Sequence, residues 1–190
     1  IFWAIYMFNL TATLKQDEKI AILTSDGTLI ITAGKSYDRS NDLKKLCIEH
    51  STLSLLSRNP EGLNYETMFQ AYFLDGAQKT RLTELSKDAD DYRSKSIYQS
   101  IQIDDILTEP GKDGIIYGLV KGQLVLNGKF GDSSFVYPEN FRLTLTMVKN
   151  PRVGMNGYAP YVVNSYVLKK TKSSSAINIA SEDKSKEGNQ

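Results

Sequence analysis

Residues 116–126 read IYGLVKGQLVL, and this stretch decides the expected fold. Ile116, Val120 and Leu124 share one face of an extended strand with Gly118 and Gly122, because side chains alternate between the two sides of a strand. Two glycines on an apolar face leave room for a helix to approach the sheet, or let the sheet bend around that helix. The stretch therefore predicts a long strand that packs against helices.

Further strands surround this one. Segments 101–107, 141–147 and 161–168 have the two-residue apolar period of strands, and Asn127-Gly128 predicts a hairpin turn after the long strand. Earlier in the chain, residues 19–33 predict a separate hairpin, because Ser25-Asp26-Gly27 lies between two short apolar runs.

Helical periodicity occupies residues 40–96. A first helix is expected to begin near Ser40, to place Leu46, Cys47 and His50 on its apolar face, and to stop at Asn59-Pro60. A second helix is expected over 65–74 with Asn64 as its cap. A third, from 75 to 96, would bury a stripe that includes Leu82 and turn Arg81 toward water.

Helices in one block, followed by strands joined through hairpin turns, are typical of α+β proteins with an antiparallel sheet. We therefore expect three helices packed on one face of a curved four-stranded antiparallel sheet. The chain has 190 residues, which predicts one globular domain with additional terminal segments. The boundaries are expected at 15–36 for a linker with the hairpin, at 37–170 for the α+β domain and at 171–190 for a disordered tail rich in Ser and Lys.

Composition excludes several functions. The net charge is +1, which argues against a dedicated nucleic-acid binder, because phosphate contacts need a clustered excess of Lys and Arg. The chain holds one Cys, so it has no intramolecular disulfide and no zinc site built on several thiolates. It also holds one His, which excludes any site that requires two.

The N-terminal segment 1–14 is apolar and uncharged. Fourteen helical residues reach about 21 Å, whereas a bilayer core is about 30 Å thick. The chain does not begin with Met, so we interpret this segment as the final part of a transmembrane anchor helix; an ordinary core helix or strand is the alternative. The anchor side chains would be Ile1, Phe2, Trp3, Ile5, Tyr6 and Phe8.

Catalytic candidates are few. Cys47 and His50 lie three residues apart on one helical face and could form a thiolate–imidazole pair, but a buried cysteine and a hydrogen-bonded histidine explain them better. The acidic cluster at 88–91 lacks the spacing of a calcium loop, and adjacent Asp104 and Asp105 would point to opposite faces of a strand. We therefore expect solvated charge at both clusters, and no catalytic, cofactor or metal site.

The connection at 150–160 is longer than a hairpin needs. It displays apolar side chains in a segment that should lie at the surface, so it is either a protein-contact loop or a loop folded back on its own domain. The residues expected to make the contact are Asn150, Pro151, Val153, Met155, Gly157 and Tyr158.

The order of these segments resembles a known family. An apolar N-terminal segment, a Thr-Ser-Asp-Gly-Thr hairpin, three helices and a sheet occur in bitopic inner-membrane components of type IV secretion and conjugation machines, of the IcmL/DotI and TraK/TraE type. Their Asn-Pro-x-Gly loop, followed by an aromatic, a β-branched residue and a Tyr, is similar to Asn150-Pro151 with Gly157-Tyr158, Val162-Val163 and Tyr166. Here extra residues are inserted after Pro151, which departs from the family pattern.

The resemblance implies a nuclear-transport-factor-like (cystatin-like) domain in the bacterial periplasm, anchored once in the inner membrane. It further implies a non-enzymatic assembly component without a cofactor, which associates with itself and with other secretion subunits and needs no direct contact with nucleic acid. Two alternatives from other classes remain open. They are a small cavity enzyme of the same fold, such as an isomerase or dehydratase, and a periplasmic ligand-binding module.

Overall fold

The computed structural model describes residues 20–23, 29–32, 40–131, 133–151 and 159–172. The chain divides into two compact units, Ile1–Leu43 and Lys44–Gln190. In the first unit, β1 (Ile20–Leu23) pairs antiparallel with β2 (Leu29–Thr32). This pairing confirms the predicted hairpin, whose turn residues lie outside the described ranges.

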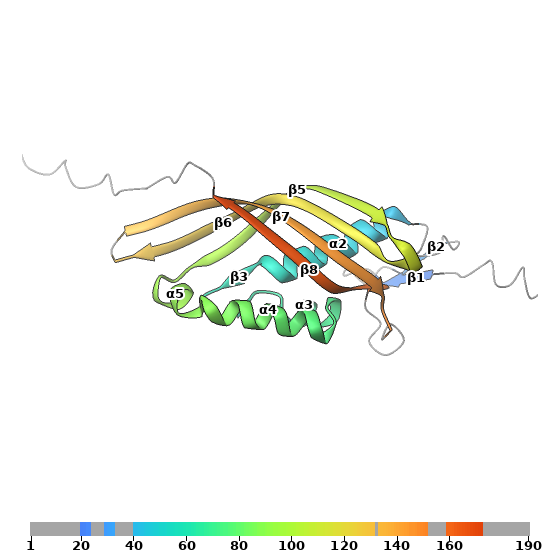
Figure 1. Ribbon diagram of the computed structural model, residues 1–190, viewed down its shortest axis with the longest axis horizontal. Coiled ribbons are helices and arrows are strands. Elements are labelled where there is room, and N and C mark those ends of the chain that lie inside the picture. The colour runs from blue at the N-terminus through green and yellow to red at the C-terminus, as the bar shows by residue number, and fades with distance from the viewer. Residues whose placement is uncertain (1–19, 24–28, 33–39, 132, 152–158, 173–190) are drawn as a thin grey trace, which may run out of the picture. The chain divides into compact units, whose positions relative to one another are not determined.

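The second unit is built on a six-stranded sheet in the order β4-β3-β5-β6-β7-β8, and every neighbouring pair is antiparallel. Its helices lie on one side of the long strands (Figure 1). The predicted α+β class, with helices packed against a curved antiparallel sheet, is confirmed. The predicted number of four strands was wrong, because two strands of two residues each extend the sheet to six. The helices are α2 (Asn41–Leu56), α3 (Glu66–Tyr72), α4 (Asp75–Lys87), α5 (Ala89–Ser94) and a 3₁₀ turn, η2 (Lys112–Gly114); the strands are β3 (Arg58–Asn59), β4 (Gly62–Leu63), β5 (Tyr98–Pro110), β6 (Ile116–Phe130), β7 (Ser133–Lys149) and β8 (Tyr161–Lys172).

Both glycines on the inner face of β6 act as the sequence predicts, each in a different way. A Cβ on Gly118 would lie 2.8 Å from the side chain of Ile48, so this glycine lets α2 approach the sheet. Gly122 lies opposite a β-bulge of β5 between Ile103 and Asp105, and a Cβ there would collide with the backbone carbonyl of Gln102. One glycine therefore admits the helix, and the other accommodates the bend of the sheet.

The core lies between the helices and the inner face of the sheet. Ser51 and Thr52 of α2 are fully buried among its apolar residues, because their hydroxyls donate to the backbone carbonyls of Cys47 and Ile48. The apolar side chains buried to 2% exposure or less are Ile48, Leu55, Leu56, Phe69, Phe73, Val120, Leu124, Phe141, Leu143, Leu145, Met147, Val162 and Val163.

The helices differ from the prediction in three respects. The third predicted helix is broken at Asp88 into α4 and α5, so four α-helices follow one another in the described part of the chain. On α4 the assignment of two neighbours was wrong, because Arg81 is buried and Leu82 is 57% exposed. The predicted cap of α3 at Asn64 was wrong, because Tyr65 precedes this helix and no side chain caps it. The start of α2 near Ser40 is confirmed, and Ser40 caps it by accepting a hydrogen bond from the backbone N–H of Leu43.

The apolar face of α2 was also predicted only in part. Cys47 is buried, but Leu46 is 44% exposed, and Ile48 lies at the centre of the contact with the sheet. Because Ile48 packs into the space over Gly118, the buried face is rotated by about one residue from the stripe that the sequence predicts.

The Asn127-Gly128 turn prediction was wrong. Both residues continue β6 and pair with Val136 and Phe135 of β7. The absence of a side chain on Gly128 instead gives room to the ring of Phe135, which lies 2.5 Å from the position a Cβ would take. At the other end of the sheet, β8 extends through Thr171 and Lys172, which composition assigns to the tail.

The predicted anchor side chains, Ile1, Phe2, Trp3, Ile5, Tyr6 and Phe8, lie outside the described residues. Within the described ranges, no helix combines the length and the hydropathy needed to cross a bilayer.

Candidate functional site

The described ends of the 150–158 connection are joined by hydrogen bonds. The side-chain amide of Asn150 donates to the carbonyl of Ala159, and its backbone N–H donates to the carbonyl of Pro160, both at 2.8 Å. Two of the predicted contact residues are described. Asn150 is buried and joins the two ends of the connection, and Pro151 next to it is exposed. Val153, Met155, Gly157 and Tyr158 lie outside the described residues.

Cys47 and His50 have the environments that the sequence favours, a buried cysteine and a hydrogen-bonded histidine. His50 Nδ1 lies 2.9 Å from the hydroxyl of Tyr72, and the two rings meet edge to face. Burial raises the pKa of the Cys47 thiol to about 11, so the sulfur is protonated near neutral pH and is a weak nucleophile. Burial, followed by the charge of Cys47, also raises the pKa of Tyr72 to about 12. Cys47 therefore belongs to the apolar core, and Tyr72 packs against that core.

The C-terminus of α2 is held by two side chains from distant parts of the chain. Arg81 of α4 donates from Nε to the carbonyl of Leu55 at 3.0 Å, and Gln99 of β5 donates to the carbonyl of Leu56 at 2.5 Å. The last carbonyls of a helix have no partner within it, and the helix dipole favours a cation there. Arg81 is therefore buried because it caps this helix end.

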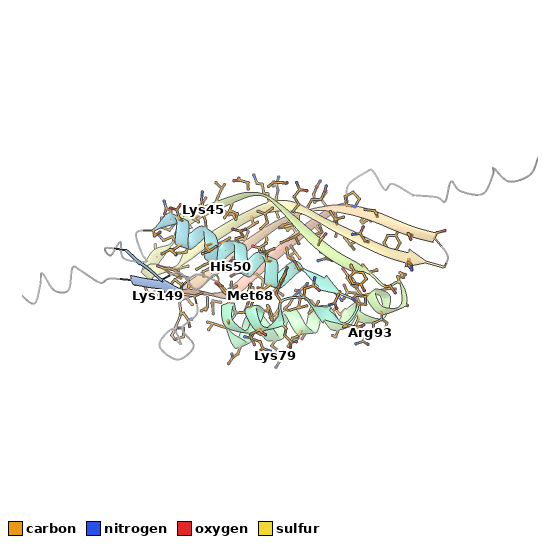
Figure 2. All side chains as sticks on the ribbon, turned by 180° about the vertical axis from the view of Figure 1, so that it is seen from behind. Lys45, His50, Met68, Lys79, Arg93 and Lys149 are labelled. Carbon is orange, nitrogen blue, oxygen red and sulfur yellow. The ribbon has the colours of Figure 1, made fainter. Side chains whose placement is uncertain are left out.

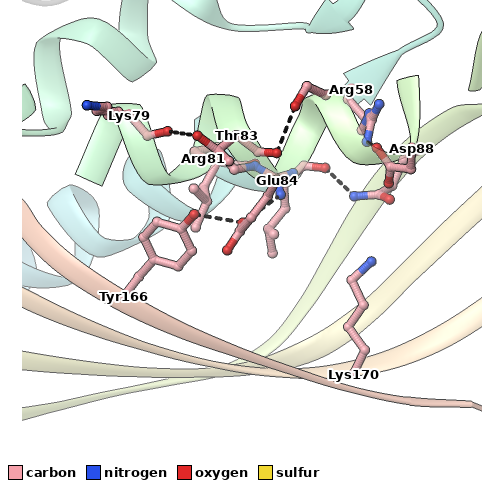
Figure 3. Close-up of polar contacts among 12 residues, drawn as sticks. Arg58, Lys79, Arg81, Thr83, Glu84, Asp88, Tyr166 and Lys170 are labelled. Atoms are coloured by element: carbon pink, nitrogen blue, oxygen red, sulfur yellow. Dashed lines mark hydrogen bonds and ion pairs between the residues drawn. The ribbon is translucent and has the colours of Figure 1, made fainter. Parts of the chain in front are cut away.

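The same arginine is part of an ion pair that reaches the edge strand. Arg81 lies 3.3 Å from a carboxylate oxygen of Glu84, and the hydroxyl of Tyr166 on β8 donates to that oxygen at 2.8 Å (Figure 3). Burial, and then the hydrogen bond to Glu84, raise the pKa of Tyr166, so it stays protonated. The network fixes α4 to β8.

A second buried arginine lies beside the first network. Arg58 pairs with Asp88 at 2.8 Å (Figure 3). Its guanidinium lies 3.3 Å from the centroid of the Tyr92 ring. Tyr92 in turn donates its hydroxyl to Gln99. Within the described residues, the Nε of Arg58 has no hydrogen-bond partner. Solvated charge, the interpretation predicted for Asp88, was therefore incomplete, because this half-exposed carboxylate neutralises a buried cation.

A groove of about 530 Å³ lies between the β3–β4 hairpin and the helices α3, α4 and α5. Phe69 and Leu85 form its apolar floor, and Glu61, Glu66 and Arg93 lie along it. Figure 2 shows Arg93 and Lys79 directed away from the sheet. None of the residues that line this groove belongs to the long strands, so it differs from a cavity enclosed between helices and sheet.

The remaining members of the two acidic clusters lie at the surface. Asp91 pairs with Lys95 at 2.9 Å, and Asp90 lies 4.0 Å from Arg93. The bulge interrupts the alternation expected at Asp104 and Asp105, and both side chains are exposed. In the described ranges, no three His, Cys, Asp or Glu side chains come together as metal ligands would.

The residues that sequence reasoning missed are the buried polar ones. Arg81 lies one position from the exposed Leu82, and on an amphipathic helix the charged residue is normally the one assigned to water. Gln99 lies two residues before the predicted start of its strand, and no local pattern indicates that its amide reaches α2. The contacts join residues 26 and 43 positions apart, so no signal within a sequence window could have found them.

Comparison with solved structures gives one informative result. The fold is similar to that of the periplasmic domain of DotI. The superposition has a TM-score of 0.52 and 12% sequence identity, and it covers 72% of this chain and 99% of that domain. Searches by sequence returned no match to a family model and no match to a curated protein. At this level of identity, the similarity establishes the fold.

Proposed function

We propose that this chain is a non-enzymatic structural component of a type IV secretion or conjugative DNA-transfer apparatus. The observation that carries the proposal is the fold similarity, which extends over 99% of the periplasmic domain of DotI. The similarity covers 72% of this chain, so it is a similarity of the fold rather than of a local motif. The protein acts through contacts with itself and with other subunits of the apparatus.

The buried polar groups support a structural role. Cys47 is a protonated thiol, and Arg81 and Gln99 bind helix carbonyls rather than facing an open cavity. Phe69, Phe73 and Leu143 belong to the apolar core between the helices and the sheet. A small cavity enzyme of this fold would need an open site with a free general base there, and the gene-deletion experiment below distinguishes that alternative from the structural role.

The location proposed for the protein is the bacterial inner membrane, with the α+β domain in the periplasm. The uncharged segment 1–14 supports this placement as the end of a membrane anchor. Fractionation of cells that express the complete gene tests it. The protein should sediment with inner membranes and resist alkaline carbonate extraction, while protease added to spheroplasts should degrade the domain. Recovery of the intact protein in the cytosolic fraction would contradict this placement.

The function itself is tested by deleting the gene in its source organism. Secretion or conjugative transfer should be lost while growth is unaffected, and a plasmid copy should restore it. Affinity purification in mild detergent should recover other subunits of the apparatus with the tagged protein. Normal transfer in the deletion strain would overturn the proposal, and a growth defect relieved by a metabolite would favour the enzyme alternative.

A further inference from the structure

The outer face of the sheet, away from the helices, carries a row of three apolar residues and one threonine that crosses four strands. Leu107 of β5 pairs with Leu119 of β6, Leu119 with Thr144 of β7, and Thr144 with Val167 of β8. Leu107 is 48% exposed and Val167 56% exposed, and the two residues between them are half-buried. With strands about 4.8 Å apart, the row is about 14 Å long. We call these four residues the apolar row.

A charged row runs parallel to it on the same face. Asp105, Lys121, Arg142 and Lys169 are aligned across the same four strands, and all are exposed. They precede or follow the apolar row by two residues on each strand, which separates the two rows by about 7 Å. We call these four residues the cationic row, because three of its four members are basic.

We propose that this face binds an amphipathic helix of a partner protein, in which an apolar stripe is flanked by carboxylates. A helix with its side chains is about 10 Å wide, so one helix covers both rows together. About ten residues at 1.5 Å per residue match the length of the apolar row. The apolar stripe would lie over Leu107 and Val167, and the carboxylates would face Arg142 and Lys169.

Charge favours a protein partner over an anionic membrane surface. Asp105 ends the cationic row on β5, and Glu109 lies on the same strand, next to the apolar row. Both would be repelled by anionic headgroups. A helix can instead place a basic residue opposite Asp105 and carboxylates opposite the three cations, which also fixes its direction. The proposed binding does not depend on the proposed secretion function, because it is argued only from the residues of this surface.

The binding is tested with two synthetic helical peptides that share one leucine stripe and differ in their flanking residues, which are Glu in one and Lys in the other. Each is titrated into the ¹⁵N-labelled 190-residue chain. The Glu-flanked peptide should bind at least about tenfold more tightly. Its amide shifts should cluster at the outward residues of β5 to β8. In the double variant Arg142→Glu/Lys169→Glu the preference should reverse, whereas the matched control Lys79→Glu/Arg93→Glu, on the helix side, should leave it unchanged.

Equal binding of the two peptides, or amide chemical-shift changes confined to the helices, would overturn the proposal. It would also be overturned if phosphatidylglycerol vesicles, or a raised protein concentration without either peptide, caused the shift changes on this face. A photocrosslinker at position 167 of the complete protein in its own cells gives a second readout. The adduct should map to an acidic amphipathic helix and disappear in Arg142→Glu/Lys169→Glu. Failure of these tests would leave the gene-deletion result, and hence the proposed function, unaffected.

Discussion

The side chain of Ile48 on α2 occupies the space that a side chain on Gly118 of β6 would need. The two residues are 70 positions apart in the chain, and a Cβ on Gly118 would lie 2.8 Å from Cγ1 and 2.9 Å from Cδ1 of Ile48. This contact sets how closely α2 approaches the sheet, and therefore how the core between them is packed.

Replacing Gly118 by Ala should lower the free energy of unfolding by about 1–3 kcal/mol, because the added methyl group displaces Ile48 or the strand. Urea denaturation measures the change. In the double variant Gly118→Ala/Ile48→Ala the loss should be smaller than the sum of the single losses, since the clash is gone. Gly76→Ala on α4 is the control; with no atom within 4 Å, it should be neutral or stabilising by up to about 1 kcal/mol. Additive losses would contradict the contact.

Arg81→Met should destabilise the protein by about 1–3 kcal/mol, because the buried carbonyl of Leu55 loses its donor while the aliphatic stem is kept. Chemical denaturation followed by circular dichroism measures the loss. Lys79→Met on the exposed side of the same helix is the matched control and should change stability by no more than about 0.5 kcal/mol. Equal effects of the two substitutions would show that Arg81 does not cap α2.

The buried thiol of Cys47 should make stability depend on alkaline pH. Its pKa is about 11 in the folded chain against a reference value of 9.0, so between pH 9 and 11 the unfolded chain loses this proton first. The stabilising contribution is therefore complete below pH 9 and falls as the pH rises toward 11, by about 2–3 kcal/mol in total. The comparison is between the wild type and Cys47→Ala, in unfolding titrations across this range. If the free energies of unfolding of the two proteins fell in parallel with pH, the loss could not be attributed to the Cys47 thiol.

The double variant Cys47→Ala/His50→Gln should retain function, because Cys47 packs in the core and His50 bonds the Tyr72 hydroxyl. A stability loss of about 1–2 kcal/mol from reduced packing is expected. Complementation of the deletion strain, alongside thermal melting of the purified variant, measures both. Loss of function in a fully folded variant would reinstate an enzymatic role.

Met155→Asp and Tyr158→Asp should weaken self-association without lowering the melting temperature, if the 150–158 loop is a contact surface, because a carboxylate in an apolar interface costs free energy only on binding. Light scattering and crosslinking in membranes measure the association. Asn150→Ala is the control for an effect on folding. Loss of its hydrogen bond to Ala159 should reduce the free energy of unfolding by about 1–3 kcal/mol. Unchanged association in both Asp variants would mean that the loop only covers its own domain.

Local patterns were sufficient for the elements whose buried face repeats along the chain. The alternation of β6, with Gly118 and Gly122 on its inner face, predicted both the strand and the curvature. A two-residue apolar period determines which side chains of a strand face the core. Ser40 as the cap of α2 and the hairpin of β1 and β2 followed from short-range hydrogen bonds and turn chemistry.

Only the tertiary structure decided which polar residues are buried. Arg81 and Leu82 exchange their expected environments because the carbonyls of α2 need a donor, and that need comes from a helix end 26 residues away. Asn127-Gly128 does not turn but pairs with Val136 and Phe135 of β7, and the ring of Phe135 packs over the glycine. The alignment of Leu107 with Val167 across four strands depends on the register of three successive strand pairings, β5 with β6, β6 with β7 and β7 with β8. Sequence periodicity determined the elements, and long-range pairing determined the surfaces, because each pairing joins residues that no local pattern relates.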